Sequence, residues 1–488
     1  MNLIVVSNRL PFVFSRDAEG AWRLEPGSGG LVTALRPVLR DRGGRWIGWT
    51  GVTEEELPDA TPLLAGSERR FGYTLIPVGL SSAERDGFYY GFSNEIVWPL
   101  FHDLTPSRFD PSYWAVYESV NQKFADVTAQ NAGRDDFIWV HDYHLIRLGG
   151  ALRERGLQNR IAFFLHIPFP PLDIFLKLPW RFQVMRSLLQ YDLIGFQTVR
   201  DRRNFAQCLR LLFRDAEITG KGAVWTVFGE GRHARVGSFP ISIDVQEFER
   251  RVSEAGVLEK TQSLRRHEAG RKIILGIDRL DYTKGIPQKL EAFRTLLTRY
   301  PELRGRVTLF QIVVPSREDI PRYRDHKVSL ERLVGEINGR FTTSGWVPIH
   351  YIYRSLEGVR LPAYYRAADI AFVTPLKDGM NLVAKEYCAS RVDEDGVLVL
   401  SEFAGAAAQL QKGAFLVNPF DEHGVADTLY RAVGLPAEER RSRMRKLRRA
   451  VREYDIYRWL DTFLAAAISK ELADFPRVED YLPESAAQ

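Results

Sequence analysis

The sequence predicts an α/β protein of two domains, each built on a parallel sheet. Strand-like apolar runs alternate with amphipathic helical patterns along the chain, which is the order that βαβ units require. With 488 residues the chain is too long for one ordinary hydrophobic core, and a charged helical stretch at residues 245–271 separates two βα series. We predict a first domain at residues 1–245 and a second at residues 246–455. A final helix at residues 456–475 is expected to pack back on the first domain, before a tail at residues 476–488.

The composition is that of a globular protein, with 45% hydrophobic and 26% charged residues, and it excludes the disordered and membrane classes. The chain starts directly with the strand-like LIVV, so we expect no signal peptide, and no later stretch is apolar enough to span a bilayer. The two cysteines, Cys208 and Cys388, lie far apart and not in a metal-type spacing. This usage favours a reducing compartment, and we expect a cytoplasmic protein.

The net charge of +5 is modest, and its densest basic block is residues 439–453. Met444, Leu447 and Val451 form an apolar stripe at helical spacing within this block, which predicts a packed helix with a solvated basic face. A surface for nucleic acid or an acidic partner is the alternative, but no nucleic-acid-binding motif accompanies the block. We expect small-molecule substrates and neither a nucleic-acid nor a membrane partner, and a homo-oligomer stays open.

Polar residues follow the first strand, at residues 3–6. The strand delivers Arg9, and the loop GSGG, which contains Gly29 and Gly30, then opens a helix. Such a loop at a helix N-terminus can approach a phosphate or a sugar. The dinucleotide fingerprint G-x-G-x-x-G and the Walker loop are both absent, which argues against a nucleotide-dependent oxidoreductase and a P-loop enzyme.

An aromatic cluster, FYYGFSNEIVWPLFHDL, occupies residues 88–104. Clusters of this kind are core in most proteins. Tyr89 and Trp98 can also stack on a sugar face while their polar tips form hydrogen bonds. Both interpretations remain open from the residues alone.

Two further strands of the first domain end in polar side chains. FIWVHDYHL delivers Asp142, a candidate hydrogen-bond acceptor or general base, between His141 and His144, for which metal binding is the alternative. The strand at residues 161–165 leads to His166, and the prolines of HIPFP fix the backbone just beyond this histidine. That arrangement suits a histidine held over a pocket, although a hydrogen-bonded core histidine fits the pattern too.

The second domain delivers cations from its strand ends. KIILGIDRL ends with Arg279, and the following DYTKG supplies Lys284; VTLFQIVVPSRED delivers Arg317 in the same way. A guanidinium can bind a phosphate bidentately and an ammonium acts as a point charge. The pattern therefore indicates a phosphate site.

The stretch TPLKDGMNLVAKEY, residues 374–387, joins a buried strand to a helix through a turn at Gly379. Asp378 precedes the turn and Glu386 lies one helical turn inside the helix. Helix N–H groups that hold a diphosphate, flanked by two acceptors for hydroxyls, suggest a ligand with a sugar at each end of a diphosphate. The simpler interpretation is an ordinary strand–turn–helix with Asn381 as the N-cap.

The motifs SNRLP, HDYHL, FFLHIPFP, RLDYTKG and KDGMNLVAKEY, in this order, closely resemble those of trehalose-6-phosphate synthases, which are retaining glycosyltransferases. The resemblance extends from Leu3 to Leu472. It implies the glycosyltransferase-B fold, in which two Rossmann-like domains face each other across a cleft. It also implies transfer of glucose from a nucleoside diphosphate glucose to glucose-6-phosphate. UDP-glucose is the expected donor, and the sequence leaves GDP- and ADP-glucose open as alternatives.

The resemblance assigns roles by position. His166 and Asp378 would hold hydroxyls of the transferred glucose, and Arg279 and Lys284 would stabilise the departing diphosphate; these four are the implied catalytic residues. Glu386 would bind the ribose. The implied donor residues are Gly29, Gly30, Arg279, Lys284, Leu356, Asp378, Leu382, Val383, Ala384, Lys385 and Glu386. The implied acceptor residues are Arg9, Tyr89, Trp98, Asp142 and Arg317.

The resemblance implies a front-face substitution with retention, because no carboxylate stands out as a nucleophile. Arg279, Lys284 and the helix dipole would neutralise the leaving group, so no metal or other cofactor is expected. A glucosylglycerol-phosphate synthase and a non-catalytic sugar-phosphate sensor are the alternatives. A sensor would be expected to have lost some ionic donor groups, and all of them are present.

Overall fold

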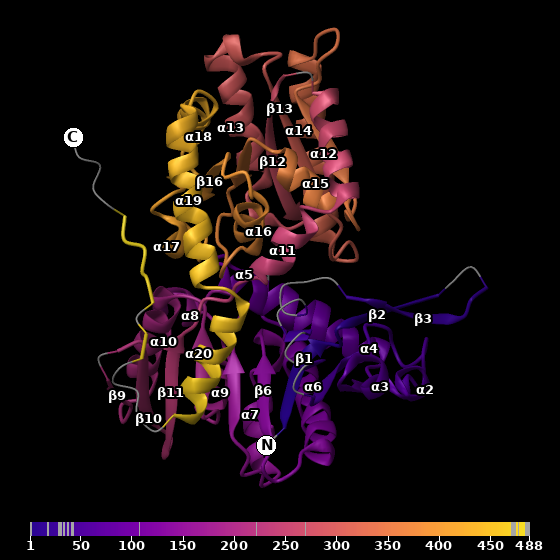
Figure 1. Cartoon of the computed structure of the whole chain (residues 1–488). Coiled ribbons are helices and arrows are strands. Elements are labelled where there is room, and N and C mark those ends of the chain that lie inside the picture. The colour runs from indigo at the N-terminus through magenta and orange to yellow at the C-terminus, as the bar shows by residue number, and fades with distance from the viewer. Residues whose placement is uncertain are drawn as a thin grey trace. The chain divides into compact units, whose positions relative to one another are not determined.

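The computed structural model describes residues 2–16, 19–27, 32, 35–36, 39–40, 43–106, 108–220, 222–268, 270–469, 475–476 and 478–483. The chain divides into two compact units (Figure 1). Unit 1 combines Met1–Pro240 with Trp459–Val478, and unit 2 combines Ile241–Arg458 with Glu479–Gln488. Each unit contains a largely parallel sheet with helices between its strands, so the predicted α/β class with two Rossmann-like domains is confirmed.

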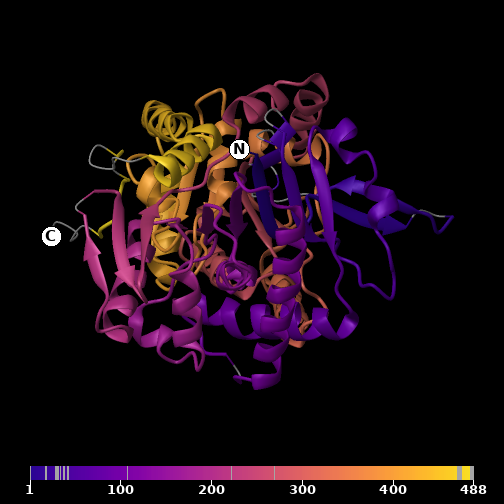
Figure 2. The ribbon, with the colours of Figure 1, turned by 90° about the horizontal axis from the view of Figure 1, so that it is seen from below.

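Unit 1 is organised around a nine-stranded sheet in the order β5-β4-β1-β6-β7-β8-β11-β10-β9. Its strands are β1 (Leu3–Arg9), β4 (Arg45–Trp49), β5 (Thr74–Val78), β6 (Phe137–His141), β7 (Ile161–Phe164), β8 (Leu193–Phe196), β9 (Glu217–Thr219), β10 (Val224–Gly229) and β11 (Arg232–Ser238). Neighbours from β5 to β11 run parallel, whereas β10 pairs antiparallel with β11 and β9. Every residue of β6, β7 and β8 is buried, as in parallel strands covered on both faces. A separate hairpin, β2 (Phe12–Arg16) with β3 (Trp22–Pro26), extends from the body of the unit (Figures 1 and 2).

Helices follow the strands of unit 1. They are α2 (Thr61–Leu64), α3 (Ser67–Phe71), α4 (Ser82–Glu84), α5 (Trp98–Phe101), α6 (Pro111–Asn131), α7 (Leu148–Glu154), α8 (Leu172–Phe175), α9 (Arg181–Leu188), α10 (Val199–Leu212) and the 3₁₀ turn η2 (Tyr143–Leu145). The aromatic-rich segment forms a π-helix, η1 (Arg85–Val97), which continues into α5. Within η1 the ring of Phe92 packs 4.3 Å from Tyr117 of α6. Because π-helical turns are frequent at functional sites, the position of Tyr89 on η1 is notable.

The final helix, α20 (Ile456–Ile468), contributes to the core of unit 1 from residue 459 onward. Trp459 and Phe463 stack on Trp139 of β6, with ring centroids 5.1 and 4.4 Å apart. Stacked aromatic pairs of this kind add to the apolar area that they bury. Most of the last helix therefore belongs to the core of unit 1, which also contains the first strand.

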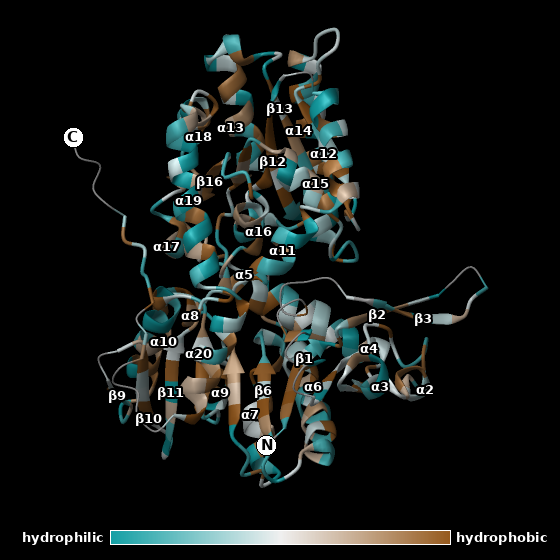
Figure 3. Ribbon diagram, viewed as in Figure 1, coloured by the Kyte–Doolittle hydropathy of each residue, from teal (hydrophilic) through white to brown (hydrophobic). Residues whose placement is uncertain are grey.

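Unit 2 is organised around a six-stranded, fully parallel sheet in the order β14-β13-β12-β15-β16-β17. Its strands are β12 (Lys272–Arg279), β13 (Val307–Val314), β14 (Ile349–Tyr353), β15 (Ile370–Val373), β16 (Val397–Ser401) and β17 (Phe415–Val417). Its helices are α11 (Val245–Arg251), α12 (Ala255–His267), α13 (Ile286–Arg299), α14 (Pro321–Phe341), α15 (Arg360–Ala367), α16 (Leu382–Ser390), α17 (Ala407–Leu410), α18 (Glu422–Val433) and α19 (Ala437–Glu453), with the 3₁₀ turns η3 (Tyr282–Lys284) and η4 (Pro301–Leu303). Apolar residues concentrate on the strands, and the surrounding helices carry hydrophilic faces (Figure 3). In the described part of the chain, no helix is long and apolar enough to cross a membrane.

The basic block forms α19, and the burial of all three residues of its predicted apolar stripe is confirmed. Arg448 is also buried, which the interpretation of a solvated basic face did not anticipate. Its guanidinium donates to the carbonyl oxygens of Cys388 and Ala389 and pairs with Glu249 at 2.7 Å. At least one basic side chain of α19 therefore faces the interior of unit 2, where it links α19 to α16 and α11.

A buried ion pair joins β12 to α13. Lys289 Nζ lies 2.5 Å from Asp278 Oδ2, and neither side chain is more than 1% exposed. Gln311 Nε2 of β13 donates to the same oxygen at 3.0 Å. Replacing Lys289 with methionine leaves this carboxylate buried without its counter-charge. We expect the free energy of unfolding, measured by urea denaturation, to fall by about 3–5 kcal/mol.

The matched control is Lys327→Met, which removes a partly exposed ion pair with Glu331 on α14 and a contact with the Tyr353 ring, and should cost about 1 kcal/mol or less. A Lys289→Met/Asp278→Leu double variant should regain much of the lost stability, because no charge is then left buried. Equal losses for the two single variants would contradict a stabilising role for the buried pair.

Candidate active site

The predicted cationic residues and Asp378 follow the carboxyl ends of three neighbouring strands in unit 2. β12 ends at Arg279 and leads to Lys284, β13 leads to Arg317, and β15 leads to Asp378. β12 lies between β13 and β15 in the sheet. In open α/β sheets, ligands bind beyond this edge of the strands. The structure thus brings these four residues to the edge where a ligand is expected.

Lys284 and Asp378 are in direct contact. Lys284 Nζ donates to Asp378 Oδ2 at 2.6 Å, and the two side chains are 13% and 14% exposed. Lys284 ends η3, just before Gly285 in the left-handed conformation with φ of 64°. A Cβ atom at Gly285 would overlap the carbonyl oxygen of Thr374, so glycine lets the loops after β12 and β15 approach each other. This close approach allows the pair to form.

Asp281 is a buried carboxylate that the cations share. Its Oδ1 accepts from the amide and the hydroxyl of Thr283 at 3.0 and 2.9 Å, and its Oδ2 lies 3.8 Å from Arg317 Nη1. Burial works against its ionisation, but the charges of Arg317, Arg279 and Lys284 outweigh burial and hold its pKa below the ordinary value. The sequence prediction omitted Asp281, although its position within RLDYTKG was a signal. With Asp378 included, three cations face two carboxylates, and the excess positive charge suits phosphate.

Arg317 has a strained backbone with φ of 52°, in the region that favours glycine. Its Nη1 donates to the hydroxyl of Tyr323 at 2.7 Å, and its side chain is 7% exposed. Strained residues persist where the surrounding structure enforces them, and they cluster at ligand-binding positions. The conformation of Arg317 is consistent with a guanidinium held for a ligand.

The turn before α16 has the ordinary helix N-cap at Asn381, and it also orients Asp378, the predicted ligand-binding carboxylate. Asn381 Oδ1 accepts from the amide of Ala384 at 3.1 Å, so the interpretation of Asn381 as N-cap is correct. Asn381 Nδ2 also donates to Asp378 Oδ2 at 3.1 Å. The residue that caps the helix therefore also orients the carboxylate, together with Lys284.

Two predicted donor residues on α16 use their side chains within unit 2. Lys385 Nζ donates to the carbonyl oxygen of Ile241 at 2.7 Å, and burial lowers the pKa of this lysine to about 7. Glu386 Oε2 accepts from the hydroxyl of Tyr365 at 2.6 Å, and burial raises the pKa of this carboxyl. Leu356 is half-buried in the loop that follows β14. For Lys385, only the main chain is left to contact a ligand at the helix start.

In unit 1, the predicted acceptor residues Arg9 and Tyr89 lie together. The Arg9 guanidinium carbon is 4.6 Å from the ring centroid of Trp49 and 5.4 Å from that of Tyr89. Such cation–π contacts orient a guanidinium. Trp49 comes from the neighbouring strand β4 and carried no local signal in the sequence. Trp98, in contrast, is buried.

Asp142 and His166 are joined through the main chain. Asp142 Oδ1 accepts from the backbone N–H of His166 at 3.2 Å, and His166 Nε2 lies 3.1 Å from His141 Nδ1. Burial lowers the pKa of His166 to about 3. Burial and the nearby His166 ring hold the pKa of His141 well below its ordinary value. Both rings are therefore neutral near pH 7, and one donates to the other. The sequence did not predict this pairing, which follows from the adjacent strands β6 and β7.

The metal-binding alternative for His141 and His144 receives no support from their orientation. His144 stacks on the ring of Tyr89 with centroids 5.8 Å apart, whereas His141 faces His166. The predicted glycines of the first glycine-rich loop, Gly29 and Gly30, lie outside the described residues.

The chain is similar to a known enzyme family along most of its length. The model of glycosyltransferase family 20 matches residues 1–468. The trehalose-6-phosphate synthase of Mycolicibacterium vanbaalenii is 42% identical over 483 residues, which are 96% of each chain. The trehalose-6-phosphate synthase of Mycobacterium leprae is 42% identical over 473 residues, covering 95% of this chain and 94% of that one.

Solved structures give the same result. The α,α-trehalose-phosphate synthase (UDP-forming) from Burkholderia xenovorans in complex with glucose-6-phosphate matches with a TM-score of 0.86 and 37% identity, covering 96% of this chain and 100% of that chain. A structure from E. coli bound with UDP-2-fluoro glucose matches with a TM-score of 0.84 and 36% identity, covering 96% and 99%. The similarity spans both units, as the predicted fold class requires.

Proposed function

This chain belongs to glycosyltransferase family 20, and we propose that it transfers glucose from UDP-glucose to glucose-6-phosphate, releasing α,α-trehalose-6-phosphate and UDP. The observation that carries the proposal is the contact between Lys284 and Asp378, beside the cations that share Asp281. Positive groups there suit a diphosphate, and a carboxylate suits sugar hydroxyls. The names of the similar synthases, and the glucose-6-phosphate bound to one of them, support the same substrates.

Donor binding is proposed at the sheet edge of unit 2 and at the start of α16. Arg279 and Lys284 are assigned to the diphosphate, where the positive end of the α16 dipole adds to their charge. The remaining donor contacts are assigned to Gly29, Gly30, Leu356, Leu382, Val383, Ala384, Lys385 and Glu386. Among these, Lys385 contributes main chain only, because its ammonium is bound to Ile241.

The transferred glucose is assigned to His166 and Asp378. The low pKa of His166 keeps its imidazole neutral near pH 7, so the ring can donate to or accept from a sugar hydroxyl without adding a charge. Asp378 is held in place by Lys284 and Asn381 and can accept from hydroxyls through its remaining lone pairs. Pre-oriented groups of this kind position a substrate before reaction.

The acceptor, glucose-6-phosphate, is assigned to the five predicted acceptor residues. Arg9 and Arg317 bind its phosphate, which their charge and restrained geometry favour. Tyr89 offers a ring face for the sugar. The other two assigned residues are Trp98 and Asp142.

The proposed chemistry is substitution with retention at the anomeric carbon of the donor glucose. The anomeric hydroxyl of glucose-6-phosphate attacks on the face from which the diphosphate leaves; the bond to the leaving oxygen breaks, and a leaving-group phosphate oxygen takes the proton. Asp378 is assigned to hydroxyls of the transferred glucose and not to nucleophilic attack, and Lys284 and Asn381 hold it through its Oδ2. Lys284 and Arg279 stabilise charge that grows on the diphosphate. We expect no metal or other cofactor, because these cations supply the positive charge.

The test is release of nucleoside diphosphate from UDP-, GDP- and ADP-glucose, each with and without glucose-6-phosphate, with the product linkage determined by NMR. Release that requires glucose-6-phosphate and gives an α,α-1,1 product supports the proposal and identifies the donor base. If glucose-6-phosphate gives no release, the reactions are repeated with glycerol-3-phosphate, and release then would assign a glucosylglycerol-phosphate synthase. Binding of glucose-6-phosphate by folded protein without any release would assign a sensor.

We further propose that the protein acts in the cytoplasm. Its two cysteines are free and buried, and burial raises the pKa of both thiols to about 12. Thiols in this state are inert and need no oxidising compartment. Whether the protein forms a homo-oligomer can be measured by light scattering.

Replacing Arg317 with alanine should raise the KM for glucose-6-phosphate by about 10- to 100-fold, because a charge-assisted hydrogen bond to phosphate is lost. The KM for the nucleotide sugar should change far less. Steady-state kinetics with each substrate varied in turn make the comparison.

The matched control is Arg324→Ala, which removes an exposed guanidinium a short distance along the chain and should leave both KM values unchanged. A larger rise in the donor KM than in the acceptor KM for Arg317→Ala would move this residue to the donor site. The kinetics can distinguish the two sites, because Arg317 lies close to Asp281 and so also near the cations assigned to the donor.

A further inference from the structure

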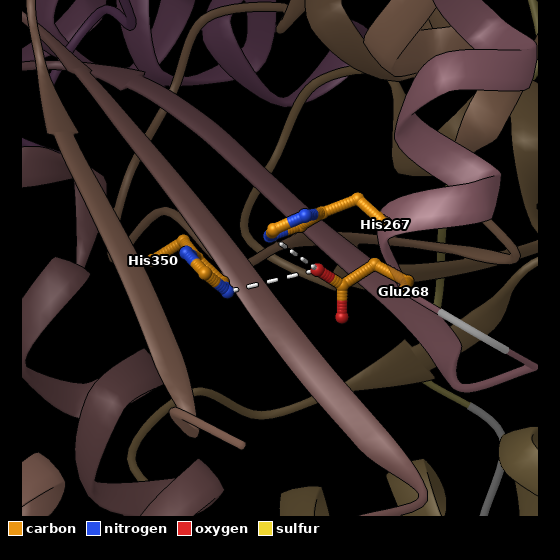
Figure 4. Close-up of side chains that lie close together, drawn as sticks. All are labelled: His267, Glu268 and His350. Carbon is orange, nitrogen blue, oxygen red and sulfur yellow. Dashed lines mark ion pairs between the residues drawn. The ribbon is translucent and has the colours of Figure 1, made fainter. Parts of the chain in front are cut away.

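A second group of polar side chains lies in unit 2, at the opposite end of its sheet from the proposed active site. His267 ends α12, Glu268 follows it, and His350 is the second residue of β14 (Figure 4). The residues assigned to substrate follow the carboxyl ends of the strands, whereas this group lies at their amino ends. Since β12 has eight residues, the two ends are about 25 Å apart. This group is therefore separate from the donor site.

Glu268 has one oxygen that is satisfied and one that is not. Its side chain is 1% exposed. Oε2 accepts from Thr308 Oγ1 at 2.8 Å and lies 3.7 Å from Arg271 Nη1. Oε1 is buried and has no hydrogen-bond partner among the residues that the structure describes. A buried carboxylate oxygen without a partner is costly, so its position calls for a ligand.

Both imidazoles face this oxygen. His350 Nε2 is 3.7 Å from Glu268 Oε1, and His267 Nε2 is 4.0 Å from it (Figure 4). The three ligand atoms all lie within 4.8 Å of one another. Ligand atoms bound to one tetrahedral Zn²⁺ are about 3.3 Å apart, so the widest spacing must shorten by at most about 1.5 Å. His267 is 74% exposed and free to supply that movement.

The surroundings orient the ligands and leave one side open. The ring of His350 stacks on Phe310, with centroids 4.6 Å apart and planes at 11°. Thr308 fixes the carboxylate through its other oxygen, as outer-shell partners of metal ligands do. A cavity of about 620 Å³, lined by His267, His350 and Tyr364 among others, adjoins the group and offers room for a fourth, solvent ligand.

We propose that His267, Glu268 and His350 bind a divalent transition-metal ion, with Zn²⁺ as the best fit. Two imidazoles and one carboxylate are a typical ligand set for Zn²⁺, whereas Mg²⁺ and Ca²⁺ prefer oxygen ligands alone. The ion links the end of α12 to the start of β14, which are more than 80 residues apart in the chain. It therefore stabilises the amino-terminal edge of this sheet and takes no part in glucosyl transfer.

The test is isothermal titration calorimetry of the full-length, tag-free protein with ZnCl₂, combined with thermal unfolding at increasing zinc. We expect one high-affinity ion per chain and a Tm that rises with zinc concentration. Co²⁺ should give the visible absorption of a tetrahedral site. The His267→Ala/His350→Ala variant should lose the high-affinity ion, and Thr308→Val should bind it about 10- to 100-fold more weakly.

The matched control is His423→Ala, which removes an exposed histidine of α18 and should leave zinc binding unchanged. Glucosyl transfer without zinc should be the same in the wild type and in the double variant. Glu268→Gln provides a second test if the double variant does not fold. Absence of a one-to-one complex, or undiminished binding by both variants, would overturn the proposal. A further contradicting result would be a Tm that rises on acidification without zinc in the wild type but not in the double variant. The two histidines would then form an ion pair with Glu268.

Discussion

Replacing Lys284 with alanine should lower kcat by roughly 10²- to 10³-fold, as expected when one group that stabilises developing negative charge is removed. In the proposed reaction, charge grows on the departing diphosphate, and the ammonium of Lys284 is fixed nearby by Asp378. Its contribution should therefore be larger in the transition state than in the ground state. Steady-state rates at saturating UDP-glucose and glucose-6-phosphate measure the loss.

The matched control is Lys446→Ala, which removes an exposed lysine of α19 and should leave kcat unchanged. Lys284→Arg keeps the charge but changes its shape and should recover only part of the rate. An increase in the donor KM alone, with kcat unchanged, would mean that Lys284 binds substrate and transition state equally. That result would remove it from the catalytic residues.

Replacing Asp378 with alanine should lower kcat by at least about 10³-fold, because a group that orients the reacting sugar is lost. Binding of the nucleoside diphosphate, which has no glucose, should be retained. Asp378 is the shared acceptor for Lys284 and Asn381, so the variant also frees the ammonium. Calorimetry with UDP and steady-state kinetics on the same preparation separate the two effects.

Asp325→Ala is the matched control, since it removes an exposed carboxylate of α14. The double variant Lys284→Ala/Asp378→Ala completes a double-mutant cycle, and direct contact predicts that the two losses are not additive. A parallel loss of UDP binding in Asp378→Ala would show that this carboxylate acts by holding Lys284. Its assignment to the transferred glucose would then be wrong.

Much of the fold could be predicted because it depends on local patterns. The alternation of buried strands and amphipathic helices was visible in the sequence, and both sheets follow it. The apolar stripe of α19 and the N-cap at Asn381 were also local. Arg448 shows the limit of such patterns, since its burial depends on the carbonyl oxygens at the end of another helix. Its spacing places it on the face of Met444, Leu447 and Val451, but nothing local shows that carbonyl oxygens lie there to accept from a buried guanidinium.

The candidate site divides in the same way. The sequence indicated that Arg279, Lys284 and Asp378 follow strands, because strand ends are marked by the change from apolar to polar residues. It did not indicate Asp281 as the carboxylate that the cations share, since this role depends on burial. Lys385 shows the opposite case, in which a predicted donor residue directs its side chain to a distant carbonyl oxygen.

By itself the sequence determined the fold class, the family and the charged residues at strand ends, because each can be recognised from consecutive or regularly spaced residues. Only the tertiary structure decided which of these residues touch. Lys284 meets Asp378 across 94 residues and His141 meets His166 across 25, and Glu268 faces His350 from another element. These contacts depend on the order of strands in a sheet and on side-chain packing. Both arise from long-range burial, which no local pattern encodes.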